Sequence, residues 1–134
     1  MTLIQLIFYL TLLTKRANPI EYDTITQITN TFREAYGCRP VSEDDNLTRA
    51  AQARADEIFE SGHFSHDGVW ETVEPIYRYR VAGENLARNF NTDEAMVVAW
   101  MKSPNHRENI VNCKYKDIGI GRRDDYVVQL FGRK

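Results

Sequence analysis

The chain has 134 residues, 43% of them hydrophobic and 27% charged, which is ordinary usage for one globular domain and excludes a disordered or fibrous protein. Its 17 basic and 19 acidic side chains leave a formal net charge of −2, so the sequence lacks the basic footprint of a nucleic-acid-binding protein. One segment departs from this average. Residues 3–13 are almost wholly apolar, whereas the remaining sequence has the composition of a water-exposed domain.

This apolar leader, residues 1–17, has three interpretations. The apolar run at 3–14 has the length of a signal-peptide core, but no basic side chain precedes it and residues 14–17 form a poor cleavage site. The run is shorter than the roughly 20 apolar residues of a membrane span. Lys15 and Arg16 follow the run, whereas a signal peptide carries its charge before it. The sequence therefore leaves a signal peptide, an anchor with membrane contact through residues 3–14, and a docking helix open.

Two helices are predicted in the first half of the remaining chain, residues 18–134. Residues 18–21, Asn-Pro-Ile-Glu, form a helix-start pattern, and Gly37 is a plausible end. A second helix is expected from Ser42, with acidic residues 43–45 in its first turn, to Gly62. The apolar side chains that mark these two helices are Ile25, Ile28, Phe32, Ala35 and Tyr36, then Leu47, Ala50, Ala51, Ala55, Ile58 and Phe59.

Shorter helices and strands are predicted after residue 62. A loop and a short helix fill 63–80, and a capping box at 91–94 starts a helix through Met101. Residues 95–101 are apolar on all sides, so this helix is expected to lie between two layers. Ser103 then caps a short helix that ends near Asn112.

The last part of the chain changes from helical to alternating periodicity. Residues 116–120 and 126–130 alternate around a polar turn at 122–125, which predicts a β-hairpin, and a further strand is expected at 83–88. Strands that follow and interrupt helices favour an α+β fold. We expect a three-layer α-β-α sandwich with a small antiparallel sheet covered by helices on both faces.

The two cysteines, Cys38 and Cys113, are not part of a Cys-x-x-Cys motif, which argues against a zinc knuckle or a thioredoxin-type site. In an exported domain they would often pair and close a long loop. In a cytosolic protein they would stay as two unpaired thiols. Pairing and compartment are therefore linked, and both alternatives stay open from the residues alone.

The candidates for chemistry are three histidines and one glutamate. His63 and His66 lie in one loop, and His106 is the third residue of a short helix, where the helix dipole favours a neutral imidazole that can bind a metal or accept a proton. Glu84 stands beside a glycine at a strand start and can reach a cleft. The alternatives are surface or structural histidines and a solvated edge carboxylate. No His-Glu-x-x-His, Gly-x-Ser-x-Gly or phosphate-binding loop is present.

Five motifs then occur in a fixed order. They are Phe-Ser-His at 64–66, Gly-Glu-Asn-Leu-Ala at 83–87, Trp-Met-Lys-Ser-Pro-Asn-His-Arg-Glu-Asn-Ile at 100–110, Ile-Gly-Ile-Gly at 118–121 and Val-Gln-Leu-Phe-Gly at 128–132. Together they resemble the CAP superfamily, also called the SCP or pathogenesis-related-1 domain, in its compact prokaryotic form. The resemblance spans residues 22–132, so residues 18–134 are expected to form a CAP/SCP domain.

The resemblance implies an α-β-α sandwich, an extracellular or cell-envelope location, and a cleft of two histidines and two acidic residues that in some members holds a divalent cation such as zinc. His66, Glu84 and His106 match three of these positions and are the candidate catalytic residues. The fourth position is Ser103, so the full set is absent. His66 and His106 are the candidate metal ligands. His63 and Glu108 match no position of the family's set.

Three functions follow as hypotheses. The first is a binding module whose His/Glu cleft, with Ser103 as a binding residue, recognises an envelope component, a lipid or a protein partner, but not nucleic acid. The second is a structural component docked through the N-terminal helix. The third is a hydrolase in which zinc or a His/Glu pair activates water. A Ser103–His106 nucleophile pair is disfavoured, because a capping hydroxyl is already engaged by backbone N–H groups.

Overall fold

The computed structural model describes residues 2–5 and 21–134. Residues 3–5 are helical, and residues 1 and 6–17 of the predicted leader, together with the Asn-Pro-Ile start at 18–20, lie outside the described residues. Within the described ranges no helix combines the length and the apolar character that a membrane crossing requires. In chain order the elements are α2 (Thr24–Ala35), β1 (Ser42–Glu43), α3 (Asp45–Ser61), α4 (Val69–Val73), β2 (Val81–Arg88), α5 (Asp93–Lys102), α6 (Pro104–Ile110), β3 (Asp117–Arg123) and β4 (Tyr126–Arg133).

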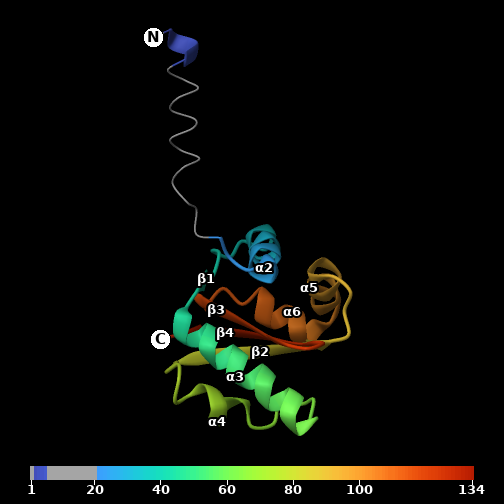
Figure 1. The fold of residues 1–134 in the computed structure, drawn as a ribbon. Helices are drawn as coiled ribbons and strands as arrows, with labels where there is room; N and C mark the ends of the chain where they lie inside the picture. The colour runs from blue at the N-terminus through green and yellow to red at the C-terminus, as the bar shows by residue number, and fades with distance from the viewer. Residues whose placement is uncertain (1, 6–20) are drawn as a thin grey trace.

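These elements form a sheet between two helical layers, which confirms the expected α-β-α sandwich (Figure 1). The strand order is β1-β3-β4-β2, and β2, β4 and β3 pair antiparallel as predicted. Helices α3 and α4 share one hydrophobic core with the sheet, while α2, α5 and α6 share the other. Strand β2 is therefore an outer strand of the sheet that both helical layers flank.

Two glycines of β3 allow α3 to lie directly on the sheet. A Cβ atom on Gly119 would collide with the backbone of Leu47, and one on Gly121 would collide with the backbone of Ala51. Both collisions are with helix backbone, which cannot move aside as a flexible side chain can. The Ile-Gly-Ile-Gly motif thus places isoleucines in one core and clears space for a helix on the opposite face.

The predicted start of the second helix at Ser42 is wrong. Ser42 and Glu43 form β1, which pairs parallel with β3, so the sheet is not antiparallel throughout. The helix is capped two residues later by Asp44, whose Oδ1 accepts the N–H of Leu47 at 2.9 Å. Because several acidic residues stand in a row here, the sequence did not distinguish the capping side chain from its neighbours. The first helix likewise begins at Thr24, capped by Asp23, and residues 21–23 are not helical.

The expectation that the apolar helix at 95–101 lies between two layers is also wrong. Met96, Val97 and Trp100 of α5 are buried, but Ala95 and Val98 are exposed, because α5 is an outer helix with no layer beyond it in the described structure. Its exposed face carries Ala95 and Val98 together with the charged Glu94 and Lys102. Phe59 and Tyr36, both placed by periodicity on helix faces with buried residues, are exposed as well.

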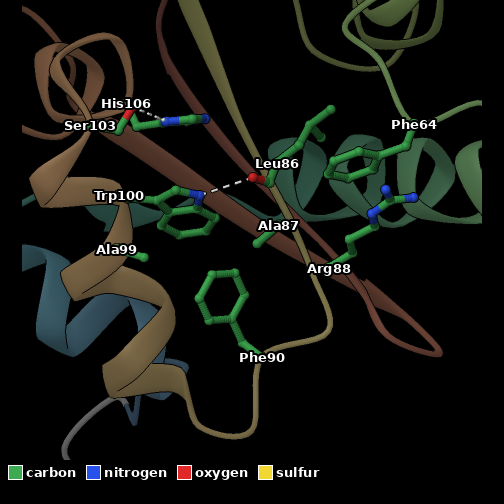
Figure 2. A pocket seen from close by; sticks show the side chains of 9 residues that line it. All are labelled: Phe64, Leu86, Ala87, Arg88, Phe90, Ala99, Trp100, Ser103 and His106. Carbon is green, nitrogen blue, oxygen red and sulfur yellow. Dashed lines mark hydrogen bonds between the residues drawn. The ribbon is translucent and has the colours of Figure 1, made fainter.

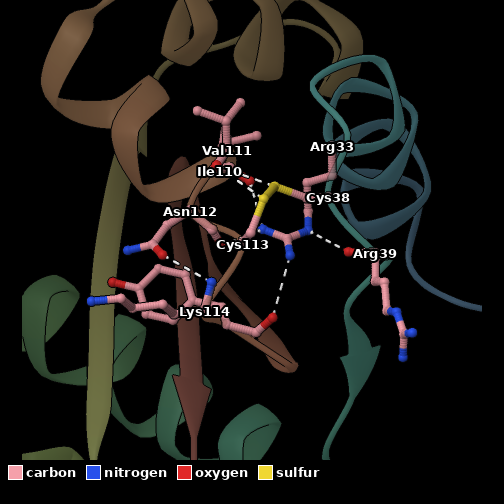
Figure 3. The surroundings of a disulfide bond; sticks show 9 residues. Arg33, Cys38, Arg39, Ile110, Val111, Asn112, Cys113 and Lys114 are labelled. Atoms are coloured by element: carbon pink, nitrogen blue, oxygen red, sulfur yellow. Dashed lines mark hydrogen bonds between the residues drawn. A yellow bond between two sulfur atoms is a disulfide. The ribbon is translucent and has the colours of Figure 1, made fainter.

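Cys38 and Cys113 form a disulfide with their Cα atoms 4.9 Å apart (Figure 3). The bond joins the loop after α2 to the loop between α6 and β3. It closes a sequence separation of 75 residues. The paired alternative from the sequence is therefore the one that the structure shows, and it is the alternative associated with an oxidising compartment.

A buried arginine lies beside the disulfide (Figure 3). Arg33 is fully buried, and among the described residues its guanidinium donates only to backbone carbonyls, those of Arg39, Ile110, Asn112 and Tyr115, at 2.8–3.3 Å. Burial without a carboxylate partner lowers the pKa of Arg33. The guanidinium and the disulfide thus connect the same two loops, one by hydrogen bonds and one covalently.

Candidate functional site

The candidate site lies at β2, the outer strand of the sheet on the side of β4. The Glu84 side chain is 2% exposed, whereas that of His66 is 61% exposed. Glu84 accepts a hydrogen bond from His66 Nδ1 at 2.8 Å and one from Arg54 Nε at 2.9 Å. A carboxylate only accepts, so Nδ1 of His66 carries the proton and the other ring nitrogen, Nε2, is left for a ligand.

Arg54 is the residue that organises this part of the site. It lies on the buried face of α3 and is 2% exposed. Besides Glu84, its guanidinium bonds the carbonyl oxygen of Ser65 and approaches Glu57 at 3.4 Å. Arg54 therefore fixes both the carboxylate and the loop that carries His66. Glu84 is an ion-paired group that orients a histidine, and it is neither a solvated edge carboxylate nor a free acid.

Ser103 and His106 form the second half of the site. Ser103 precedes α6, but its hydroxyl makes no capping bond, and Oγ lies 2.8 Å from Nδ1 of His106 instead. The predicted capping role of this side chain is therefore wrong, and with it the argument that a Ser103–His106 pair is prevented by capping. In the described structure His106 has no carboxylate partner of the kind that orients the base in a catalytic triad.

The neutral form of His106 is favoured, as the sequence predicts. Burial is the main cause that lowers the pKa of His106 below its ordinary value of 6.5, and the positive charge of protonated His66 lowers it further. His66 is close enough to His106 for its charge to act, so the two histidines belong to one electrostatic unit.

We expect the pKa of His106, followed by the NMR shift of its ring protons, to lie below 6.5 and to rise in a His66→Gln variant, because the charge of His66 is then removed. A His63→Gln variant is the matched control, since His63 is not among the groups that affect His106. An unchanged His106 titration in His66→Gln would contradict the coupling. Because the folded state binds this proton less readily than the unfolded state, His106 should make the protein less stable as pH falls below 6.5.

An open pocket of about 260 Å³ adjoins His106 (Figure 2). Its lining is mostly apolar and comes from β2, α5 and the loops beside them: Phe64, Leu86, Ala87, Arg88, Phe90, Ala99, Trp100, Ser103 and His106. The Trp100 indole donates from Nε1 to the carbonyl oxygen of Leu86 at 3.0 Å. Of the residues predicted from the sequence, Ser103 and His106 line this pocket, while His66 and Glu84 lie beside it.

A buried polar network supports the site from below. Asn85 of β2 donates to the carbonyl of His106 at 3.1 Å and to Gln129 of β4 at 2.9 Å. Asn109 of α6 donates to Asn85 Oδ1 at 2.9 Å and to the carbonyl of Glu84 at 3.1 Å. These bonds hold α6, and with it His106, against β2. Satisfied buried networks of this kind specify one arrangement of the groups they join.

The donor set does not fit a catalytic zinc centre. Glu84 is occupied by Arg54 and His66, and Nδ1 of His106 by Ser103, which leaves one nitrogen on each imidazole. Catalytic zinc uses three protein ligands. In the part of the chain that the structure describes, no group of three or more His, Cys, Asp and Glu side chains is placed to hold a metal ion. A metal bound by His66 and His106 alone stays a prediction.

The remaining histidine and the second nearby glutamate stand apart from this arrangement. His63 lies 3.5 Å from Asp67, and both side chains are exposed. Glu108 is exposed on α6. The residue that sequence reasoning missed is Arg54, and a signal for it existed. Arg54 falls at helical spacing among the apolar residues of α3, a position at which a cation must find a buried partner.

Comparisons with known proteins agree with the motifs. Residues 26–131 match the family model described as the cysteine-rich secretory protein family, CAP. The uncharacterized protein YkwD of Bacillus subtilis is 31% identical over an alignment of 109 residues, and the match covers 72% of this chain and 40% of that protein. The uncharacterized membrane protein YlbC of the same organism is 27% identical over an alignment of 113 residues, and the match covers 80% of this chain and 33% of that protein. The chain thus spans well under half the length of these relatives.

Solved structures show the same fold. An extracellular SCP-domain protein of Bacillus anthracis is 25% identical with a TM-score of 0.78, over 82% of this chain and 39% of that one. An outer surface protein of Borrelia burgdorferi is 23% identical with a TM-score of 0.75, over 82% of this chain and 90% of that one, and shows the fold alone. With the family model covering most of the described domain, the chain belongs to the CAP, or cysteine-rich secretory protein, family.

Proposed function

We propose that this chain is an exported or envelope-associated binding module that takes its ligand in the pocket beside β2. The observation that carries the proposal is the pocket itself: aromatic walls from Phe90 and Trp100 meet the Ser103–His106 pair at one end. Mostly apolar walls with few, convergent polar groups are typical of ligand sites. At about 260 Å³ and open to solvent, the pocket suits one side chain or ring of a larger ligand.

The disulfide and the relatives support the location. A disulfide that closes a long loop persists in oxidising compartments. The related structures include an extracellular protein and an outer surface protein, and one relative is a membrane protein. In this proposal the leader at 1–17 serves export or attachment, as a signal peptide, an anchor or a docking helix. Mass spectrometry of the mature N-terminus distinguishes a cleaved leader from a retained one.

The same geometry favours binding over hydrolysis. A general base must have a proton acceptor that faces the substrate. The carboxylate of Glu84 is buried and shared between Arg54 and His66, so it does not face the pocket as a free base. His106 faces the pocket, but its Nδ1 bonds a serine and not a carboxylate. The histidine that a carboxylate does orient, His66, is not among the residues that line the pocket, so the pocket itself has the polar contacts of a recognition site.

The test is NMR titration of the ¹⁵N-labelled protein with three probes: a blocked hexapeptide of alternating aspartate and leucine, N-acetylglucosamine oligomers, and phosphatidylglycerol vesicles. We expect one probe to shift the Trp100 indole signal and the amides of 86–88. Phe90→Ser should weaken that binding at least about tenfold, equivalent to about 1.4 kcal/mol. Phe59→Ser is the matched control, because Phe59 and Phe90 are 39% and 40% exposed and only Phe90 lines the pocket. Absence of pocket shifts with all three probes, or equal losses in both variants, would overturn the proposal.

A further inference from the structure

Every second residue of β2, an outer strand of the sheet, turns its backbone N–H and C=O away from β4. Asn89 N–H pairs with Asp125 on the β4 side, so odd-numbered residues of this strand face β4. The carbonyls of Glu84 and Leu86 instead accept hydrogen bonds from the side chains of Asn109 and Trp100, which lie outside the sheet. Since the N–H and C=O of one strand residue point to the same side, Leu86 and Arg88 also direct their N–H groups outward.

Along this edge, carbonyl oxygens are hydrogen-bonded by side chains, whereas two backbone N–H groups are not. The Glu84 and Leu86 carbonyls are occupied by Asn109 Nδ2 at 3.1 Å and Trp100 Nε1 at 3.0 Å. The N–H groups of Leu86 and Arg88 have no acceptor among residues 2–5 and 21–134. Both residues line the pocket. A ligand that supplies hydrogen-bond acceptors can therefore pair with this part of the backbone in place of solvent.

The positively charged side chain beside this edge also favours a ligand that carries hydrogen-bond acceptors. The Arg88 guanidinium lies 4.9 Å from the centroid of the Phe64 ring, and within the described ranges it forms no ion pair (Figure 2). The one acidic side chain of the site, Glu84, is neutralised by Arg54. The groups beside this edge that favour an oxygen ligand are thus a cation and backbone amide donors, which together prefer anionic and carbonyl oxygens.

The side chains around the edge alternate between two faces. Arg88 and Phe64 lie toward the α3 side, with Phe64 against the core that α3 shares with the sheet, whereas Trp100 belongs to the core on the α5 side. A strand added to the edge would direct its alternate side chains to these same two sides. One side presents a cation, and the other presents the aromatic wall of Phe90 and Trp100.

We infer that the β2 edge takes an extended peptide that carries acidic side chains on one face and apolar side chains on the other. Leu86 and Arg88 stand two residues apart, about 6.7 Å along a strand, and an extended peptide repeats its carbonyls at the same spacing. Acidic side chains meet Arg88, and apolar side chains enter the pocket beside Trp100. Backbone bonds supply affinity and alternate side chains supply specificity, as in other cases of strand addition. This inference rests on the proposed function, because it names the ligand class of the same pocket.

The test uses the hexapeptide of alternating aspartate and leucine, and the same peptide with asparagine for aspartate. Binding should slow hydrogen exchange of the Leu86 and Arg88 amides at least about tenfold. The Ala87 amide, which faces β4, is the internal control and should change little. Arg88→Gln should weaken the aspartate peptide about tenfold and leave the asparagine peptide almost unaffected, whereas Arg123→Gln, which removes a cation stacked on Phe59 at 4.6 Å, should weaken neither.

The outcomes separate this inference from the proposed function. Peptide binding without protection of Leu86 and Arg88, or equal weakening of both peptides by Arg88→Gln, would overturn strand addition. Pocket binding of the N-acetylglucosamine oligomers or the vesicles, with no peptide binding, would overturn the peptide ligand and leave the binding module intact. Absence of binding by every probe would overturn both.

Discussion

Replacing Arg54 with methionine is expected to lower the free energy of unfolding by about 3–5 kcal/mol, the cost of removing one partner of a buried ion pair. Arg54 and Glu84 are each 2% exposed and 2.9 Å apart, so the substitution leaves the carboxylate buried beside His66 alone. It also frees the Ser65 carbonyl, which accepts from the same guanidinium. Equilibrium unfolding in urea measures the loss.

Two further variants make this result specific. Arg49→Met changes an exposed arginine on the same helix and should alter stability by no more than about 0.5 kcal/mol. Adding Glu84→Gln to Arg54→Met should recover part of the loss, because the uncompensated charge is then removed. A loss in Arg54→Met no larger than in Arg49→Met would show that the pair contributes nothing, and a double variant less stable than the single one would contradict the electrostatic cause.

Removing the disulfide is the second large effect. A Cys38→Ala/Cys113→Ala variant should lose about 4 kcal/mol of unfolding free energy, because the bond spans 75 residues and restricts the unfolded chain. Urea unfolding with and without dithiothreitol measures the loss in the natural sequence. The chain contains two cysteines, so the alanine variant is the control in which the reductant should have no effect. An unchanged urea midpoint of the natural sequence under reducing conditions would contradict the prediction.

Arg33 is expected to preserve the fold when the disulfide is reduced. Its guanidinium holds the carbonyls of Arg39 and Asn112 at 3.0 and 2.8 Å, one near each cysteine. The two loops therefore stay connected when the sulfur atoms separate. We accordingly expect the reduced protein to keep the sandwich under native conditions, with the effect visible as a shifted unfolding midpoint.

Local periodicity predicted the architecture because each element buries one face. The sequence predicted the apolar face of α3, the alternation in β3 and β4, and the polar turn between these two strands. The structure confirms all three. Periodicity did not predict burial correctly where the apolar residues were not confined to one face of a helix. Residues 95–101 are apolar all round, yet α5 has an exposed outer face, since hydrophobicity alone does not say whether another layer covers a helix.

Sequence motifs also located most of the site residues but not their partners. His66, Glu84, Ser103 and His106 were all named from the sequence, and the structure places them in two bonded pairs at one edge. The buried guanidinium of Arg54 bonds Glu84, which lies 30 positions away in the chain. A hydroxyl that the sequence assigned to a helix cap bonds an imidazole instead. The Arg54 contact depends on a distant partner, whereas Ser103 chooses between two groups that both lie within three residues of it.

The CAP fold, the α-β-α order of its layers and the residue types of the cleft could be predicted from the amino-acid sequence, because periodicity and collinear motifs are local properties of a chain. The packed fold was needed to show that Cys38 and Cys113 pair, that Arg54 neutralises Glu84, and that the N–H groups of Leu86 and Arg88 have no acceptor among the described residues. These depend on which groups the packed layers exclude from water and bring within bonding distance, and that is a property of the whole fold.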